Sequence, residues 1–259
     1  MLTISSTQNP KIKELITIQE KSAYRRKSGL FVIEGTKELR HAIEAGIEIV
    51  TIFCKSPQNI DFLETHHLTD KCFCVSDHVY SRIAYRDGSD AVIAIAKRPI
   101  LSLNELKLSA SPLVIVLETV EKPGNLGAVL RTADAVKADA VIICDPTTDI
   151  YNPNVIRSSV GAVFTTKAIA CTSEEAYKWL SDNSIQILTA QLQNSVLYYE
   201  ADLTLGTALV MGTESTGLTN FWRDRSNKAI RIPMLGQMDS LNVSVSTAIL
   251  AYEIVRQRN

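Results

Sequence analysis

Polar side chains gather after three apolar segments of the chain, in loops that lead into expected helices and, for Arg131, on such a helix. In chain order they are Asn125, Arg131, Glu214, Ser240 and Asn242. A strand that runs through such a loop into a helix leaves unpaired backbone N–H groups at the helix start, which can hold a small polar ligand. Neutral amides can position a ligand without adding charge, and an arginine can stabilise an oxyanion. Helix capping and turn bracing are the alternative roles, because Asn and Ser also favour those positions.

Six apolar segments in the second half of the chain predict the strands that must position these residues. They span residues 113–117, 140–144, 166–170, 185–189, 208–211 and 229–232. Strands buried on both faces read as unbroken apolar runs, a pattern typical of a parallel sheet covered by helices. Helices are expected between them, over residues 126–137, 154–163, 173–181 and 218–223. The sequence therefore predicts a doubly wound α/β domain over residues 112–259.

Shorter elements alternate in the first part of the chain. Strands are expected over residues 31–33, 47–54, 72–75 and 91–96, and helices over residues 36–45 and 77–84. Such alternation predicts a second, small α/β domain over residues 1–98. A polar run bracketed by Pro99 and Pro112 predicts a linker over residues 99–111.

Charge gives no global signature of nucleic-acid binding. The formal net charge of the 259 residues is −1, so any surface that binds nucleic acid must be local. Residues 1–30 hold six lysines or arginines and two glutamates, a local charge of +4. Within this run, Arg25, Arg26 and Lys27 are either an edge that contacts phosphates or the solvated face of a helix.

The remaining composition indicates a cytoplasmic protein without a metal. No apolar run reaches the roughly 18 residues of a membrane span, and the N-terminus lacks the apolar core of a signal peptide. Five scattered cysteines are expected to be reduced thiols. His66 and His67 with Cys72 and Cys74 could bind zinc in principle, but their spacing fits no standard zinc finger.

Three segments together resemble the three motifs of the SpoU (TrmH-like) family of RNA ribose 2′-O-methyltransferases, in the SPOUT superfamily. They span residues 125–133, 209–218 and 230–253. The resemblance covers residues 111–259 and implies a deep trefoil knot, which general rules of topology would not predict. Residues 22–40 resemble, more loosely, the entry to the L30e-like substrate-binding domain that precedes many SpoU catalytic domains. Family members form homodimers through the knotted domain, and the apolar helix over residues 243–255 is a candidate interface element.

The resemblance also implies roles for individual residues. S-adenosylmethionine would be held by Gly212, Ile232 and Leu241, and Thr189 and Ala190 end a strand that would line the same pocket. The catalytic residues would be Asn125, Arg131, Glu214 and Asn242, and RNA would contact Arg25, Arg26, Lys27, Arg157 and Ser240. A free guanidinium is too basic to accept a proton at neutral pH. Arg131 therefore either has an unusual environment as a general base or stabilises the oxyanion while another group takes the proton.

The expected reaction is the methylation of a ribose 2′-hydroxyl in structured RNA, with S-adenosylmethionine as methyl donor and no metal. Ribosomal RNA is the expected substrate because of the N-terminal domain, and transfer RNA is the alternative. A non-catalytic RNA-binding or ribosome-assembly protein of the same fold, and a methyltransferase that acts on a base, are the rival interpretations.

Overall fold

The chain forms two compact units in the computed structural model, which describes residues 2–56, 60–85, 92–213 and 215–259. The first unit comprises Met1–Ile100 and Tyr151–Thr165, and the second comprises Leu101–Ile150 and Thr166–Asn259. The chain passes from the first unit to the second after Ile100, within the linker expected over residues 99–111. It returns once to the first unit, over Tyr151–Thr165. Among the described helices, none combines the length and apolar character needed to cross a bilayer.

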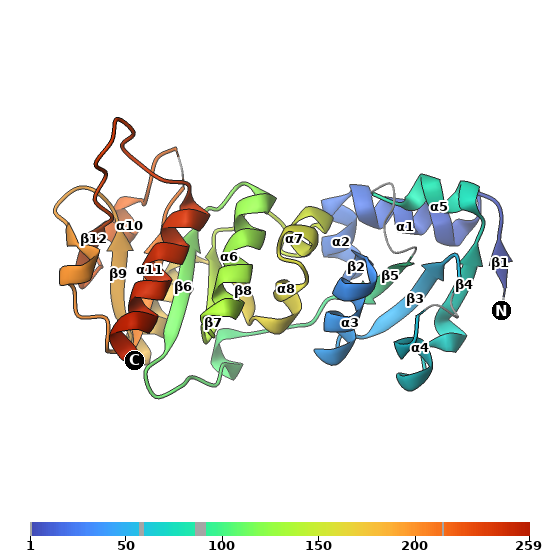
Figure 1. Ribbon diagram of the computed structural model, residues 1–259, viewed down its shortest axis with the longest axis horizontal. Helices are drawn as coiled ribbons and strands as arrows, with labels where there is room; N and C mark the ends of the chain where they lie inside the picture. Colours follow the sequence, from blue (N-terminus) through green and yellow to red (C-terminus); the bar gives the residue numbers. More distant parts are fainter. Residues whose placement is uncertain (1, 57–59, 86–91, 214) are drawn as a thin grey trace. The chain divides into compact units, whose positions relative to one another are not determined.

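The first unit is built on a five-stranded mixed sheet (Figure 1). The strand order is β1 (Thr3–Ile4), β4 (Cys72–Val75), β3 (Ile49–Cys54), β5 (Val92–Lys97) and β2 (Leu30–Glu34). Its helices are α1 (Pro10–Glu20), α2 (Ser22–Ser28), α3 (Thr36–Glu44), α4 (Phe62–Thr65) and α5 (Asp77–Ile83), with a 3₁₀ turn at Thr69–Lys71. The helix α1 begins where Asn9 Oδ1 accepts a hydrogen bond from the Lys11 backbone N–H, and Pro10 occupies its first turn. The sequence predicted all of these strands except the two-residue β1.

Two short helices from the middle of the sequence, α7 (Pro153–Ser158) and α8 (Ala162–Thr165), pack in the first unit. The sequence placed one helix over residues 154–163 among the elements of the C-terminal domain, and here the structure differs. The segment packs on the aromatic ring of Phe31 in β2. The centroid of this ring lies 4.6 Å from that of Tyr151 and 5.9 Å from that of Phe164. The next side chain along β2, Val32, points to the opposite face and packs with α1.

The second unit is a seven-stranded sheet in which every described pair of strands is parallel, as the apolar runs predicted. The order is β10 (Val196–Leu197), β12 (Lys228–Arg231), β9 (Gln186–Ala190), β11 (Thr207–Met211), β6 (Leu113–Glu118), β7 (Ala140–Cys144) and β8 (Ala168–Cys171). Every residue of β6, β7 and β11 is buried, which explains the unbroken apolar character of these segments. Because neighbouring strands are parallel, their carboxyl ends meet at one edge of the sheet.

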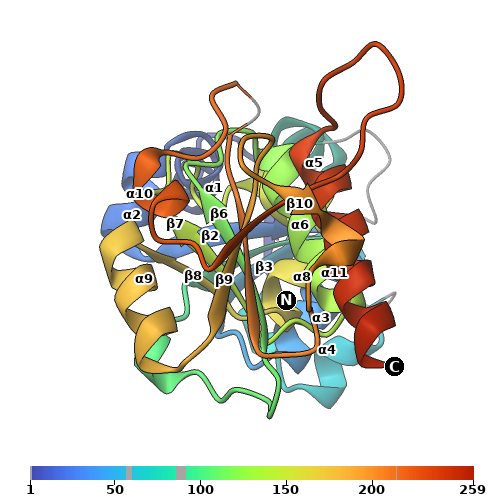
Figure 2. The ribbon, with the colours of Figure 1, turned by 90° about the vertical axis from the view of Figure 1, so that its left-hand side faces the viewer.

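Helices cover both faces of this sheet (Figure 2). They are α6 (Pro123–Ala135), α9 (Ser173–Asp182), α10 (Asn220–Arg223) and α11 (Val243–Arg258), with 3₁₀ turns at Leu103–Glu105 and Tyr198–Glu200. On one face, α9 and α10 pack Trp179 and Trp222 against strand residues that include Val114 and Val116. On the other face α6 and α11 lie side by side (Figure 1). The three segments singled out in the sequence, residues 125–133, 209–218 and 230–253, therefore lie on this unit, at strand ends and on α6 and α11.

Candidate active site

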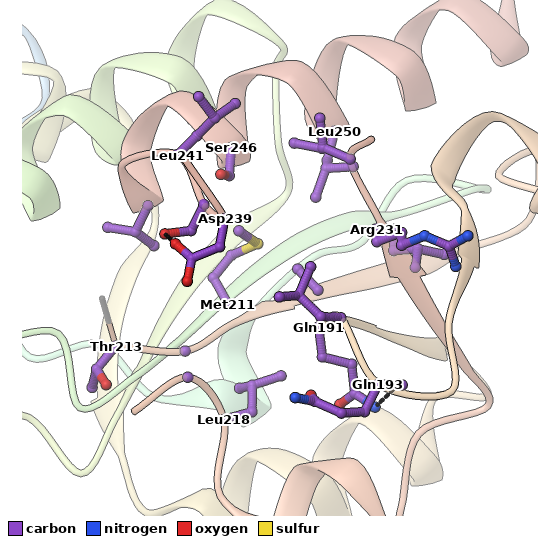
Figure 3. Close-up of a pocket in the computed structure, with 18 of the residues that line it drawn as sticks. Gln191, Gln193, Met211, Thr213, Leu218, Arg231, Asp239, Leu241, Ser246 and Leu250 are labelled. Carbon is purple, nitrogen blue, oxygen red and sulfur yellow. Dashed lines mark hydrogen bonds between the residues drawn. The ribbon is translucent and has the colours of Figure 1, made fainter. Parts of the chain in front are cut away.

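A cavity of about 420 Å³ opens at the carboxyl edge of the seven-stranded sheet (Figure 3). Its walls are the loops that follow β9, β11 and β12, together with the first turns of α11. This volume lies in the range of roughly 300–1,000 Å³ that is typical of small-molecule sites. Main-chain turns and apolar side chains such as Met211, Leu241 and Leu250 form much of its surface.

The loop after β11 is closed on itself by short-range contacts. Thr213 and Gly217 exchange two backbone hydrogen bonds of 3.2 and 3.1 Å, and the hydroxyls of Thr213 and Thr216 lie 2.8 Å apart. Gly217 has a φ of +68°, a conformation that suits glycine. Gly212 lies against this turn so closely that an added Cβ would fall 2.5 Å from the Gly217 carbonyl oxygen and nearer still to the Leu218 nitrogen. The backbone itself is therefore the wall of the cavity here.

A buried carboxylate anchors the far end of this loop to the sheet. Glu118 ends β6 and is 3% exposed. It accepts a 2.8 Å hydrogen bond from the Thr219 backbone N–H and a 2.6 Å hydrogen bond from the Thr219 hydroxyl. Both partners are satisfied, so the loop is held at each end. Residue Glu214 lies in this loop but outside the described residues.

Asn242 connects two of the three motif segments, residues 125–133 and residues 230–253. Its Oδ1 accepts a 2.9 Å hydrogen bond from the Ser244 backbone N–H and so caps α11. Its Nδ2 donates a 3.2 Å hydrogen bond to Asn125 Oδ1, across 117 positions of sequence. Asn242 therefore has the capping role that the sequence allowed, and it also lines the cavity and contacts a second polar residue beside it.

Most residues expected to hold the methyl donor line the cavity. They are Ala190, Gly212, Ile232 and Leu241, and the RNA-binding candidate Ser240 lies with them. Thr189 is different, because it is fully buried within β9 and is not part of the cavity wall. The side-chain period of a strand explains this, since Ala190 and Thr189 point to opposite faces of the sheet.

Arg131 does not reach the cavity in the described chain. It lies on α6 six residues beyond Asn125, about 9 Å further along the helix axis, and its side chain is exposed. The proposed catalytic arginine and the cavity are thus separate features of the single chain.

The basic residues expected to bind RNA have different environments in the first unit. Arg25 is 4% exposed, and its guanidinium donates hydrogen bonds to the Ile18 and Gln19 carbonyls at the end of α1. It therefore stabilises the corner between α1 and α2, and its burial leaves it unable to meet a phosphate at the surface. Arg26 and Lys27 are exposed beside it, and Arg157 is exposed with its guanidinium 5.2 Å from the centre of the Tyr85 ring.

Among the residues that the sequence interpretation missed are Gln191 and Arg223 on the cavity wall and Glu118 at the anchor of the loop after β11. Gln191 Oε1 and Arg223 Nε are buried atoms on the lining residues, and neither has a hydrogen-bond partner among the described residues. The two atoms offer an acceptor and a donor, as a polar organic ligand requires. Within the described residues, no group of three His, Cys, Asp or Glu side chains is arranged to hold a metal. All five cysteines are free thiols.

Comparison with known families and proteins gives one consistent result. Residues 112–252 match the model of the SpoU rRNA Methylase family, and residues 9–94 match the MRM3-like substrate binding domain. The 23S rRNA (guanosine(2553)-2′-O)-methyltransferase RlmP of Bacillus subtilis is 29% identical over 255 residues, covering 98% of this chain and 99% of the relative. The 23S rRNA (uridine(2479)-2′-O)-methyltransferase of Streptomyces viridochromogenes is 26% identical over 90% of this chain and 85% of its own.

Solved structures agree with these matches. An RNA 2′-O ribose methyltransferase has a TM-score of 0.84 at 37% identity and covers 99% of both chains. An AdoMet-bound rRNA methyltransferase from Sinorhizobium meliloti has a TM-score of 0.91 at 27% identity, over 98% of this chain and 97% of that one. The motifs, the parallel sheet and the cavity at its carboxyl edge agree with the family match, and this chain belongs to the SpoU rRNA methylase family.

Proposed function

We propose that this protein transfers a methyl group from S-adenosylmethionine to a ribose 2′-hydroxyl in ribosomal RNA. The observation that carries this proposal is the cavity at the carboxyl edge of the sheet, where Gly212, Ile232 and Leu241 meet and where the Asn125–Asn242 hydrogen bond lies alongside. The AdoMet-bound relative and the named rRNA 2′-O-methyltransferases support the donor and the class of substrate.

The residues present fit this donor. S-adenosylmethionine supplies an activated methyl group on a positively charged sulfur, so that the chain needs no covalent intermediate. The close backbone approach at Gly212 and the apolar side chains of Ile232 and Leu241 suit a nucleoside, and the unpaired Gln191 and Arg223 atoms suit polar groups of the ligand. Catalysis then depends on aligning the donor with the hydroxyl and on stabilising the oxyanion as it forms.

Different polar residues of the chain would position the ribose, stabilise the charge on the 2′-oxygen and contact the RNA. Asn125 and Asn242 fix each other and would orient the ribose or an adjacent phosphate by neutral hydrogen bonds. Arg131 would stabilise the developing negative charge on the 2′-oxygen or, in an environment that lowers its pKa, take the proton. Glu214 would orient the arginine or the RNA. Arg26, Lys27 and Arg157 on the first unit, with Ser240 at the cavity, would contact the RNA, and the match of residues 9–94 to a substrate binding domain supports this division.

A homodimer would explain why Arg131 and the cavity are separate in one chain. On α11, Val245 is 47% exposed and Tyr252 is 53% exposed, so about half of each side chain remains open to solvent in the single subunit. A second copy of the chain would cover these side chains and would bring its own Arg131 toward the cavity of the first copy. We also propose the deep trefoil knot of the SPOUT fold in the second unit and a cytoplasmic location, where ribosomal RNA is available.

Sedimentation of Val245→Glu and Tyr252→Asp variants tests the dimer. Charges on this face should convert a dimer to a monomer while each folded unit keeps its circular dichroism spectrum. A wild-type protein that sediments as a monomer at all concentrations would contradict the proposed interface.

Titration calorimetry with S-adenosylmethionine, followed by transfer of a labelled methyl group, tests the reaction. Total RNA would be the substrate, with nuclease mapping of the product to find the modified nucleotide. Label in a ribose of 23S or 16S rRNA is expected. Label in transfer RNA would change the substrate, and label in a base would change the reaction. Absence of donor binding would favour the non-catalytic RNA-binding or ribosome-assembly protein.

A further inference from the structure

Two buried polar atoms in the wall of the cavity lack partners, and they are chemically complementary. Gln191 Oε1 is an acceptor and Arg223 Nε is a donor, and both are inaccessible to solvent and unpaired among the described residues. An unpaired buried polar group destabilises the free protein, so such groups call for an explanation when they belong to residues that line a ligand cavity.

The orientation of Gln191 is fixed by its other amide atom. Gln191 Nε2 donates a 3.0 Å hydrogen bond to the Gln193 carbonyl, drawn as a dashed line in Figure 3. The amide therefore cannot rotate by half a turn without losing this hydrogen bond, and Oε1 remains an acceptor for a group that donates. A ligand donor such as an ammonium or a hydroxyl would meet this requirement.

Arg223 differs from the other arginine on the cavity wall. Arg231 is engaged, because its Nη1 donates to the Ser195 backbone carbonyl and hydroxyl. Arg223 has neither an ion pair nor a side-chain hydrogen bond in the part of the chain that the structure describes. Its Nη2 would lie 3.4 Å from a Cβ added at Gly217, so the guanidinium rests against the turn that leads to Leu218. A positive donor held in this way suits a carboxylate.

Both groups lie toward the same end of the cavity. In Figure 3, Gln191 and Gln193 lie on the side of the cavity where Leu218 is drawn, whereas Leu241 and Leu250 lie on the other side with Asp239 and Ser246. Arg223 lies against the Gly217–Leu218 turn and so belongs to the end that holds Gln191. An unpaired acceptor and an unpaired donor therefore lie on the same side of the cavity.

We infer that Gln191 and Arg223 bind the zwitterionic amino-acid end of the methyl donor, Gln191 Oε1 accepting from its ammonium group and Arg223 donating to its carboxylate. This inference rests on the proposed function and names the residues that distinguish the full donor from a nucleoside alone. An α-amino acid carries one cationic donor and one anionic acceptor on the same carbon, which matches the two unpaired atoms. Nucleosides without this group leave both atoms unpaired.

Calorimetry with two ligands tests the inference directly. S-adenosylhomocysteine carries the amino-acid end, whereas 5′-methylthioadenosine keeps the adenosine and the sulfur but lacks that end. We expect the wild-type protein to bind S-adenosylhomocysteine more tightly. Arg223→Met should weaken S-adenosylhomocysteine binding by roughly 10- to 100-fold, and Gln191→Met by roughly 3- to 30-fold, because charge-assisted hydrogen bonds are lost. Affinity for 5′-methylthioadenosine should change less than about twofold in both variants.

A matched control separates this effect from damage to the fold. Arg225→Met removes a neighbouring arginine that stacks on Phe221 and is not on the cavity wall, and it should leave both affinities unchanged.

The outcomes of this experiment are distinct. Loss of preference in the two Met variants, with 5′-methylthioadenosine binding retained, supports the inference. An unchanged preference, or an equal loss for both ligands, overturns it while leaving the proposed function standing. If the wild-type protein binds neither ligand, the proposed function itself fails, and the inference fails with it.

Discussion

Replacing Gly212 by alanine should displace the backbone that forms the cavity wall at Gly217 and Leu218. The added Cβ would lie 2.5 Å from the Gly217 carbonyl oxygen, closer than the 3.0 Å below which real Cβ contacts essentially never fall. The neighbouring atoms belong to the backbone, so they cannot move aside as the end of a flexible side chain would. The Gly217–Leu218 segment would have to retreat by about 1 Å, as is typical of an overpacked site.

This displacement has a calculable cost. The two hydrogen bonds between Thr213 and Gly217, at 3.2 and 3.1 Å, would lengthen beyond normal geometry. Overpacking and the lost hydrogen bonds together should lower the free energy of unfolding of the second unit by about 1–3 kcal/mol. For a domain of this size, that corresponds to a decrease in the melting temperature of roughly 2–12 °C. Affinity for S-adenosylhomocysteine should fall at least tenfold, because the displaced backbone is the cavity wall.

Thermal unfolding and calorimetry of Gly212→Ala measure both effects. Gly236→Ala is the matched control, because it lies in the loop after β12 and an added Cβ there meets nothing within 4 Å. The control should unfold and bind like the wild type. If Gly212→Ala behaves like this control, the close approach of the two backbone segments is not a feature of the protein in solution, and the reasoning is refuted.

Three further predictions concern catalysis, the loop anchor and the RNA surface. Arg131→Ala should leave the affinity for S-adenosylmethionine within a few-fold and reduce turnover by orders of magnitude, and an equal loss of both would indicate a structural role. Glu118→Ala leaves the N–H and hydroxyl of Thr219 without acceptors and should cost about 1–3 kcal/mol of stability in a denaturant titration, whereas Glu118→Gln should cost less. Replacing Arg26 and Lys27 by glutamine should reduce the salt dependence of rRNA binding by up to two units of slope in a logarithmic plot, and an unchanged slope would exclude phosphate contacts at these positions.

Burial changes the role of one basic residue in this set. The sequence grouped Arg25 with Arg26 and Lys27, because all three follow one another in a basic run. A helix turns by about 100° per residue, so consecutive residues point in different directions and only some remain in solvent. Arg25 points inward and satisfies two carbonyls at the end of α1. A salt-slope experiment that included Arg25 would therefore mix unfolding with RNA binding.

The sequence by itself determined the class of fold and the family, and it predicted which residues form the site. Long apolar runs predicted the parallel sheet of the second unit because strands buried on both faces have no polar side. The three motifs that resemble the SpoU family pointed to Asn125, Gly212 and Asn242, and the structure places Gly212 and Asn242 on the cavity wall and Asn125 beside it. Both signals are local in the chain, and so they can be read without coordinates.

Only the tertiary structure decided which of these residues meet. The Asn125–Asn242 hydrogen bond spans 117 positions, and the Glu118–Thr219 anchor spans 101. Packing of Tyr151 and Phe164 on Phe31 assigns a whole helical segment to the first unit. The unpaired atoms of Gln191 and Arg223 are likewise invisible in sequence, because burial depends on every neighbour in space and hydrogen-bond satisfaction on atomic distance. Residue identity specifies what a side chain can do, and the fold specifies which partners it finds.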